Sequence, residues 1–517
     1  MTSATADGLT PFFERYGPAY RGLVIFTTMM GTITVVLSST IVNVALPDIM
    51  GAFGIGQDQV QWMATGFLAA MTGSMLLNAW LDDTIGVRAT FIGSLMLFAA
   101  ASVVGAQAPN ENVLILARVA QGIAAGIVQP LAMIMIFRVF PPNERGRAMG
   151  IYGIAVVLAP ALGPTLGGWL IDNYDWRWVF YMGLPTSVAG MVLGSVFLPG
   201  RLGNGKRRSF DFVGLILLAL FLVMSLYTVA NGQREGWDSN LIVGLCWASA
   251  VLLLAFIAWE LKTPEPLVNL AVFGVLRYAA AAAVALIFGA GIFGSSYLVP
   301  LFVQTIQGYT PMRAGELLIP GGLILGIVFP IAGRLTDRLP AYTMVTAGLF
   351  IFGLSNLLLH DVDVDTGFWR LAWLVMLGRV GLGVMMPALN AGALSVLPAE
   401  MLAQGTGTIN FVRQLGGAFG VSLLSAATEI RFAFHADTLT ATQTADNGTT
   451  LELIKRVGGL NGVWGLPGTQ TLAGALDYLG KVIAAQAQSL AYGDGFALVG
   501  IVFWVGILPA LWMRRKH

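Results

Sequence analysis

The stretch GIAVVLAPALGPTLGGWLID, residues 153–172, is apolar enough for a buried helix, yet it contains four glycines and two prolines. In a helix interior, Gly costs about 1 kcal/mol and Pro about 3 kcal/mol relative to Ala. Ala155, Ala159, Gly163 and Gly167 recur every four positions, so they lie along one side of a helix. Such a row lets another backbone approach closely inside a membrane, where prolines are also tolerated. The stretch therefore predicts a membrane helix that rocks against a close neighbour, which we expect in another half of the molecule.

Composition extends this expectation to the whole chain. Of its 517 residues, 56% are hydrophobic and 11% are charged, and the mean hydropathy is +0.76. Soluble domains carry roughly 25% charged residues. The net charge of +1 predicts no nucleic-acid partner, and the single Cys246 excludes a disulfide within the chain. We therefore expect an all-α polytopic membrane protein, multi-pass and embedded in the lipid bilayer.

Apolar runs long enough to cross a bilayer recur along the chain, and we expect fourteen of them. If both termini are cytoplasmic, most of the 28 lysines and arginines fall on the cytoplasmic side, as the positive-inside rule requires. The expected spans are residues 21–46, 59–80, 88–107, 112–137, 146–171, 178–199, 211–231, 240–261, 278–306, 314–333, 341–360, 370–397, 404–429 and 493–513.

An internal repeat divides these spans. The segment ARVAQG at 117–122 matches GRVGLG at 378–383, with further matches on both sides. The repeat predicts two pseudo-symmetric six-helix bundles with two inserted helices between them, and duplicated halves are typical of transporters. The expected domains are a cytoplasmic lead-in at 1–20, the first bundle at 21–200, a basic linker with the inserted helices at 201–277, and the second bundle at 278–517, with an outer loop at about 430–492.

Polar side chains inside these spans are the candidate functional residues. Arg118 shares one helical face with Gln121 and Gln129. A charge at such depth costs at least about 2.5 kcal/mol, so it should face a partner or a wet cavity. Arg118 therefore either lines a transport path or packs against backbone carbonyls.

Further candidates lie in three other spans. Ser39 and Asn43 belong to a polar stripe in the first span. Arg379 is the repeat partner of Arg118, and Arg413 lies beside Asn410 in the thirteenth span. Each either lines the path or joins helices to one another.

The loop LDDTIGVR at 81–88 is either a latch between the bundles or an ordinary surface turn. Its carboxylates can cap the next helix, while Arg88 can pair with another loop. The sequence contains no phosphate-binding glycine loop, metal-ligand cluster or nucleophile constellation. We therefore expect no enzyme activity and no ATP-driven transport by this chain alone.

Several motifs in order resemble the fourteen-helix drug:proton antiporters of the major facilitator superfamily, the EmrB/QacA type. The resemblance runs from about Ser38 to the final span. It rests on STIVNVALPDI (39–49), LDDTIGVR (81–88), LILARVAQGIAAG (114–126), FPPNERGRAMG (140–150), the stretch 153–172, DWRWVFYMGLP (175–185) and RQLGGAFG (413–420).

This resemblance implies a major facilitator fold and export of hydrophobic drugs or toxic compounds across a bacterial inner membrane by alternating access. It implies no cofactor, with a proton gradient as driving force, and in Gram-negative members a periplasmic adaptor and an outer-membrane channel. It places Arg118 and Gln121 in a proton-coupling motif. The implied antiporter motif comprises Gly153, Ala159, Pro160, Gly163, Pro164, Gly167 and Gly168. The implied cytoplasmic gate comprises Asp83, Gly86, Arg88 and, in the second copy, Gly333, Asp337 and Arg338.

One departure from the family pattern concerns the proton carrier. Ser38 stands where the family's first span usually carries an acid. Glu316 is the replacement that we favour, ahead of Asp48 and Asp494. The departure keeps open an alternative function, in which the same fold exports one endogenous metabolite, lipid or siderophore, with or without proton coupling. A membrane-embedded enzyme or sensor is a remote third reading.

Overall fold

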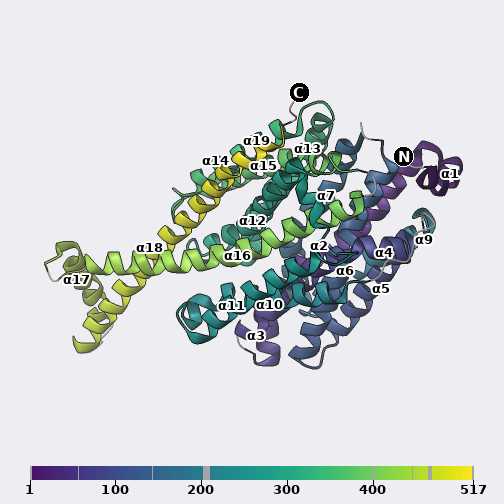
Figure 1. Cartoon of the computed structure of the whole chain (residues 1–517). Coiled ribbons are helices and arrows are strands. Elements are labelled where there is room, and N and C mark those ends of the chain that lie inside the picture. The colour runs from purple at the N-terminus through teal and green to yellow at the C-terminus, as the bar shows by residue number, and fades with distance from the viewer. Residues whose placement is uncertain are drawn as a thin grey trace.

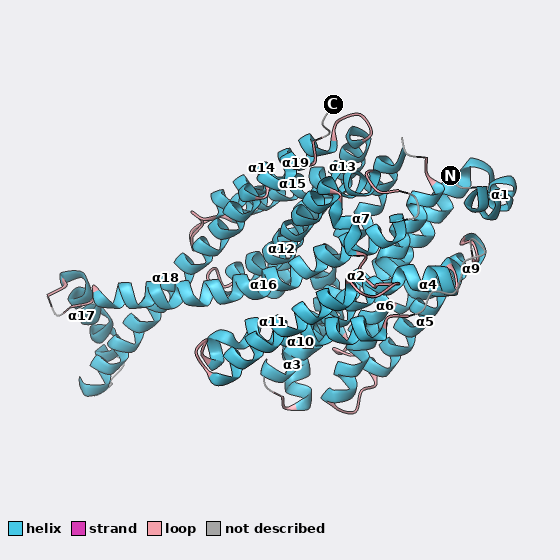
Figure 2. Ribbon diagram, in the orientation of Figure 1, coloured by secondary structure: helices cyan, strands magenta, loops and turns pink. Residues whose placement is uncertain are grey.

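The regular structure of this chain is helical throughout the described residues, with no strand among them (Figure 2). The computed structural model describes residues 3–55, 57–141, 144–201, 210–398, 401–444, 446–463 and 468–514.

Residues 3–197 contain eleven helical elements in their described part. They are α1 (Ser3–Tyr16), η1 (Gly17–Ala19), α2 (Tyr20–Phe53), α3 (Gln57–Ser74), η2 (Met75–Leu77), α4 (Asn78–Thr84), α5 (Val87–Ala106), α6 (Glu111–Val139), α7 (Arg145–Asn173), α8 (Trp178–Tyr181) and α9 (Leu184–Phe197).

The rest of the chain continues with the two inserted helices and the second bundle. Its elements are α10 (Phe212–Glu235), α11 (Asn240–Glu260), η4 (Leu270–Gly274), α12 (Leu276–Thr305), α13 (Pro311–Thr336), α14 (Ala341–Leu359), α15 (Phe368–Ser395), α16 (Leu402–Ala441), α17 (Gly448–Val463), α18 (Gly468–Val505) and α19 (Ile507–Trp512).

All fourteen expected spans overlap helices. Eleven helices of the described residues are long and apolar enough to cross a membrane. The polytopic, all-α prediction is therefore confirmed, while the count of fourteen stays a prediction. The first and last described helices, α1 and α19, lie at the same end of the bundle, which we call the terminal face (Figure 1).

Polar side chains fix where several of these helices begin. The side chain of Asn110 accepts a hydrogen bond from the Val113 N–H at the start of α6. Asp211, Ser239 and Thr310 do the same for α10, α11 and α13. These caps satisfy backbone donors that the first helical turn leaves without a partner.

The helix packing repeats between the two bundles. In the first bundle α3 and α5 pack on α6, and α2 packs on α7. In the second bundle α13 and α14 pack on α15, and α12 packs on α16. The matching pairs occupy corresponding positions in the two halves, as the internal repeat predicts.

Glycines allow the closest of these contacts. A Cβ on Gly122 or Gly126 of α6 would collide with the backbone of α3 at Phe67 and Met71. Gly416 in α16 meets the carbonyl of Leu286 in α12 in the same way. Close backbone approach supplies the packing that holds helices together inside lipid.

A helical hairpin replaces the loop expected at about 430–492. Figure 1 shows α16 and α18 running out of the bundle together, with α17 at the tip, opposite the terminal face. The sequence predicted an outer loop there, whereas the helices of the two flanking spans continue without a break. Side-chain pairs one turn apart support the exposed helices, as Lys481 with Asp477 shows at 2.6 Å.

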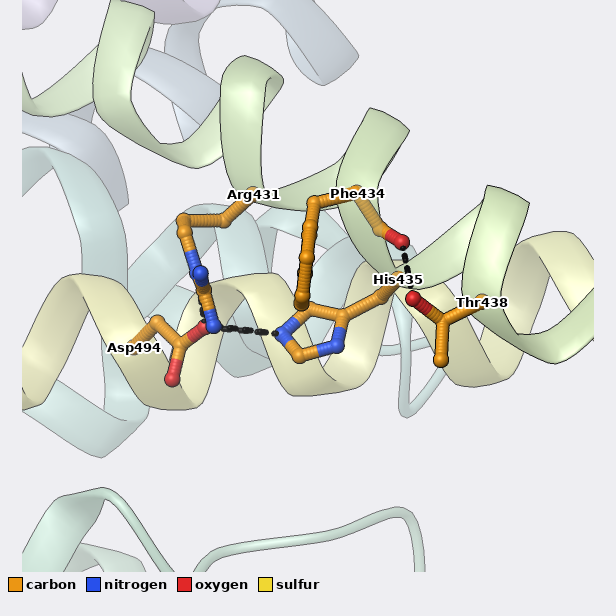
Figure 3. A network of polar contacts seen from close by, with 5 residues as sticks. All are labelled: Arg431, Phe434, His435, Thr438 and Asp494. Carbon is orange, nitrogen blue, oxygen red and sulfur yellow. Dashed lines mark hydrogen bonds and ion pairs between the residues drawn. The ribbon is translucent and has the colours of Figure 1, made fainter.

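A polar network ties the base of the hairpin together (Figure 3). In α18, Asp494 accepts hydrogen bonds from Arg431 Nε at 2.5 Å and from His435 Nε2 at 2.7 Å, both in α16. The Arg431 guanidinium also lies 4.6 Å from the centre of the Phe434 ring. These contacts fix the two long helices side by side where they leave the bundle.

The α12–α16 contact leads to a first prediction. Gly416→Ala should lower the thermal midpoint of the purified protein in detergent, because its Cβ would force the Leu286 carbonyl and α12 away. Overpacking of this kind costs about 1–3 kcal/mol. Gly459→Ala in α17 is the matched control, since a Cβ there has nothing within 4 Å. Equal midpoints for the two variants would contradict the tight contact.

Candidate functional site

Arg118 lies in α6 and is only 1% exposed. Its Nη1 donates to the Oγ and the carbonyl oxygen of Ser38, at 3.3 and 3.2 Å, and to Oε1 of Gln121 at 3.0 Å. Its Nε donates to the Met63 carbonyl at 3.3 Å, and the guanidinium lies 4.2 Å from the centre of the Phe67 ring. Helices α2, α3 and α6 therefore meet around one buried cation.

Among the described residues, every acceptor of a hydrogen bond from Arg118 is a neutral oxygen. Ser38, at the position where the resemblance expects an acid, places its hydroxyl directly on the guanidinium. Gln121 then donates to Ser102 Oγ of α5 at 2.9 Å, which extends the network. The site therefore keeps an uncompensated positive charge, where a carboxylate would have formed a buried ion pair.

Arg413 forms a second polar site, between the two halves. It lies in α16, is 9% exposed, and donates from Nη2 to the side-chain oxygen of Asn410. Asn410 in turn reaches Met133 Sδ of α6 at 3.0 Å. Tyr152 of α7 lies near Arg413. The structure thus brings the predicted pair Arg413 and Asn410 against the first bundle.

Tyr152 completes this second site from the first bundle. Its hydroxyl donates to the Gln129 carbonyl at 3.3 Å and accepts from Thr32 Oγ1 of α2 at 3.3 Å. The side chain is 2% exposed. Helices α2, α6, α7 and α16 consequently converge here.

Three of the remaining cavity candidates are not brought into either site. Arg379 of α15 donates to Ser296 Oγ of α12 at 3.2 Å, within the second bundle. Glu316 lies near the start of α13 and is exposed. Ser39 donates to the Val36 carbonyl of its own helix at 2.6 Å. The Asn43 side chain lies outside the described residues.

The antiporter stretch contacts two different neighbours along α7. A Cβ on Gly153 would lie 3.0 Å from the Phe329 ring of α13, in the other half. A Cβ on Gly167 would lie 2.9 Å from Ile41 of α2, in the same half, and Gly163 also packs on α2. The expectation of a neighbour from the other half is therefore right for one end of the stretch and wrong for the other. Nothing lies within 4 Å of a Cβ on Gly168, and the side chains of Ala159, Pro160 and Pro164 lie outside the described residues.

The ion pair and the side-chain hydrogen bond described for the first copy of the gate motif lie within its own half. Asp82 forms an ion pair with Arg138 at the end of α6. Arg88 donates to the Leu198 carbonyl at 2.7 Å. Gly86 has φ 84°, which glycine adopts without strain, and its Cα faces the backbone of Arg201.

The second copy of the motif joins the two halves at the terminal face. Asp337 at the end of α13 accepts hydrogen bonds from the N–H groups of Gly146 and Arg147, at 3.0 and 3.3 Å. These amides open α7, where the helix dipole favours a negative charge. A Cβ on Gly333 would lie 2.5 Å from the Gly146 carbonyl. The neighbouring Arg338 is exposed.

The protonation of Asp337 is coupled to this contact. Partial desolvation raises the pKa of its carboxyl above the usual value, because it outweighs the hydrogen bonds from Gly146 and Arg147. The contact therefore favours the protonated form of this carboxyl.

Sequence reasoning did not find Tyr152, Phe67 or Phe329 as parts of these sites. Tyr152 directly precedes the antiporter stretch, which is the only signal in the sequence that points toward it. In the sequence, Phe67 and Phe329 do not differ from other apolar residues of the expected membrane spans. Their roles depend on contacts between helices, which spacing along one helix does not reveal.

A family model for the Major Facilitator Superfamily matches residues 28–421 of the chain. The chain therefore belongs to this family, whose members are transporters and not enzymes. The drug-exporter resemblance is supported by relatives along nearly the whole length.

Two curated relatives are each named "Multidrug export protein EmrB". The Escherichia coli (strain K12) protein is 30% identical over 497 residues, covering 95% of each chain. The Haemophilus influenzae protein is 30% identical over 507 residues, covering 97% of this chain and 98% of the relative. A solved structure, the human organic anion transporter MFSD10 (TETRAN), is 14% identical with a TM-score of 0.59, covering 93% of this chain and 99% of that chain, and shows the shared fold.

The Asp337 contact gives a second prediction. Asp337→Ala should speed hydrogen–deuterium exchange at the first amides of α7, because two N–H groups lose their acceptor. Asp337→Asn is the matched control: it keeps an acceptor oxygen and resembles the protonated acid, so protection should persist. Unchanged exchange in the alanine variant would show that this carboxyl does not hold the two halves together.

Proposed function

We propose that the chain exports hydrophobic small molecules from the cytoplasm by alternating access, in exchange for protons. The observation that carries this proposal is the contact between α7 and α13 at the terminal face. There the two halves meet through Gly146, Gly150, Gly153 and Gly333, with Asp337 across the junction. Separation of this contact, with closure at the opposite face, is the motion that such a cycle requires.

The relatives support export as the direction of transport. The proteins from Escherichia coli and Haemophilus influenzae are named as multidrug export proteins, and both align with this chain almost from end to end. We place this chain accordingly in a bacterial inner membrane, with both termini in the cytoplasm. A periplasmic adaptor and an outer-membrane channel are the partners that this placement proposes.

Arg118 is the residue that we assign to proton coupling. Its charge is held only by neutral oxygens among the described residues, so a proton arriving at or leaving a nearby acid would change its energy strongly. Glu316 remains the proposed carrier, although it is exposed at the start of α13 and makes no contact with Arg118.

Ser38 favours a second candidate function. A serine does not release and rebind its proton at physiological pH. The Ser38 hydroxyl instead accepts a hydrogen bond from the guanidinium of Arg118. The same fold would then export one endogenous metabolite, lipid or siderophore without exchanging protons for it.

Reconstituted vesicles distinguish these two functions, which gives a third prediction. With a pH-sensitive dye inside proteoliposomes, addition of a panel of hydrophobic drugs should trigger proton movement for each compound that is transported. Arg118→Gln should abolish both drug transport and the proton signal, because the buried cation is removed. Arg177→Gln should leave both unchanged, since that arginine is exposed and pairs with Asp175. Drug transport without a proton signal would contradict the exchange for protons, whereas transport of no drug in the panel would favour the second function.

A further inference from the structure

Asp211 and Glu260 form a buried pair of carboxyl groups where the two inserted helices meet. Asp211 directly precedes α10, and Glu260 is the last residue of α11. The two residues are only 8% and 3% exposed. The Nε1 of Trp259 in α11 donates to Oδ1 of Asp211 at 2.8 Å, which joins the two helix ends. The proposed export function assigns no role to this pair.

One oxygen of each carboxyl group accepts a hydrogen bond, and the other has no partner. Oδ1 of Asp211 accepts from the Gly214 N–H at 2.8 Å, in addition to Trp259. Oε2 of Glu260 accepts from the Val268 N–H at 3.1 Å. The remaining oxygens, Oδ2 of Asp211 and Oε1 of Glu260, are buried and have no hydrogen-bond partner. Buried polar atoms are rarely left in this state, so a missing group is indicated.

The two unpartnered oxygens border the same small space. A Cβ on Gly214 would collide with both Oδ2 of Asp211 and Oε1 of Glu260. Gly214 lies in the first turn of α10, directly beside the pair. The glycine therefore leaves the room in which these two oxygens lie close to each other.

The neighbouring described residues supply no positive charge to the pair. The donors to Asp211 and Glu260 are neutral N–H groups, and no other charged residue lies within two turns of the pair on α10 or α11. Two buried carboxylates in one site repel each other unless one of them keeps a proton. The other charged residues of the adjoining segments are Lys262, which is exposed, Glu265, which is half-buried, and, outside the described residues, Lys206, Arg207 and Arg208.

We propose that Asp211 and Glu260 form a proton-binding site, in which one proton bridges Oδ2 of Asp211 and Oε1 of Glu260. The proton removes one of the two negative charges and supplies the hydrogen bond that both oxygens lack. A hydrogen bond between a carboxyl and a carboxylate is of the short, charge-assisted kind. A divalent metal ion would need several more oxygen ligands, and no third Asp, Glu, His or Cys joins the pair among the described residues.

The proton-binding site lies between two segments that attach the inserted helices to the two halves. Phe210, directly before the pair, packs on Trp80 of α4, with the ring centres 4.9 Å apart. Asn269, shortly after α11, donates to the side-chain oxygen of Gln404 in α16 at 3.0 Å. Loss of the proton would set two negative charges against each other between these attachments. The docking of α10 and α11 on the rest of the protein therefore depends on pH.

Infrared spectroscopy of the full-length protein in lipid nanodiscs tests for the shared proton. At neutral pH the wild type should show absorption of a protonated carboxyl group that Glu260→Gln and Asp211→Asn each lack. This absorption should weaken in the wild type at alkaline pH. Glu452→Gln is the matched control and should retain the absorption, because that glutamate is exposed on α17 and pairs with Arg456.

Thermal unfolding of the same variants gives a second readout. In Glu260→Gln the side-chain oxygen still accepts from Val268, and the NH₂ group takes the place of the proton, so the midpoint at neutral pH should stay near that of the wild type. The same holds for Asp211→Asn. The double variant should lose at least about 2 °C, because two NH₂ groups would face each other. Since folding takes up the shared proton, raising the pH from about 7 to about 9 should lower the wild-type midpoint more than that of Glu260→Gln.

Two results would overturn this inference. Unchanged carboxyl absorption in both single variants would show that the pair holds no proton. Single variants as unstable at neutral pH as the double variant would show that both carboxylates are ionised and balanced by a cation. Both measurements are made without a transported compound, so either result leaves the export proposal to be decided by the vesicle experiment.

Discussion

Backbone-to-backbone contact between α7 and α13 is the constraint on which the arrangement of the two halves depends. Gly146 and Gly333 meet so closely that any side chain on either would part the helices. Asp337 then accepts hydrogen bonds from two backbone amides of α7. These bonds form only when α7 and α13 lie this close together. Sites that draw residues from both halves, such as Arg413 with Tyr152, exist in their present form because this junction is closed.

Two buried arginines illustrate different uses of one side chain. Arg118 is enclosed by its own bundle, and its donors are directed at Ser38, Met63 and Gln121. Arg413 lies at the junction, where its partner Asn410 contacts Met133 of the other bundle. A cation whose donors are engaged within one bundle influences that bundle through its field, whereas one at the junction belongs to a polar contact between the two halves. The depth of a charge in the membrane therefore does not by itself define its role.

The sequence predicted the positions of the helices better than the contacts between them. Hydropathy located all fourteen segments that overlap helices, because each span must satisfy its backbone within itself. The internal repeat anticipated the matching packing of the two bundles. Small-residue spacing identified a contact face at Gly163 and Gly167 but assigned it to the wrong half, since such a face is compatible with any close backbone. The hairpin was missed because its helices are too polar to register as spans, and Tyr152 was missed because its partner lies far away in the chain.

The continuity of α16 has a mechanical consequence. One unbroken helix of 40 residues, about 60 Å long, runs from the terminal face past Arg413 to the tip of the hairpin. The Asp494 network joins it to α18 where both leave the bundle. A tilt of a few degrees near the terminal face would displace the far end of α16 by several ångströms. A small change in the interior of the protein would therefore become a larger displacement of the hairpin outside the bundle.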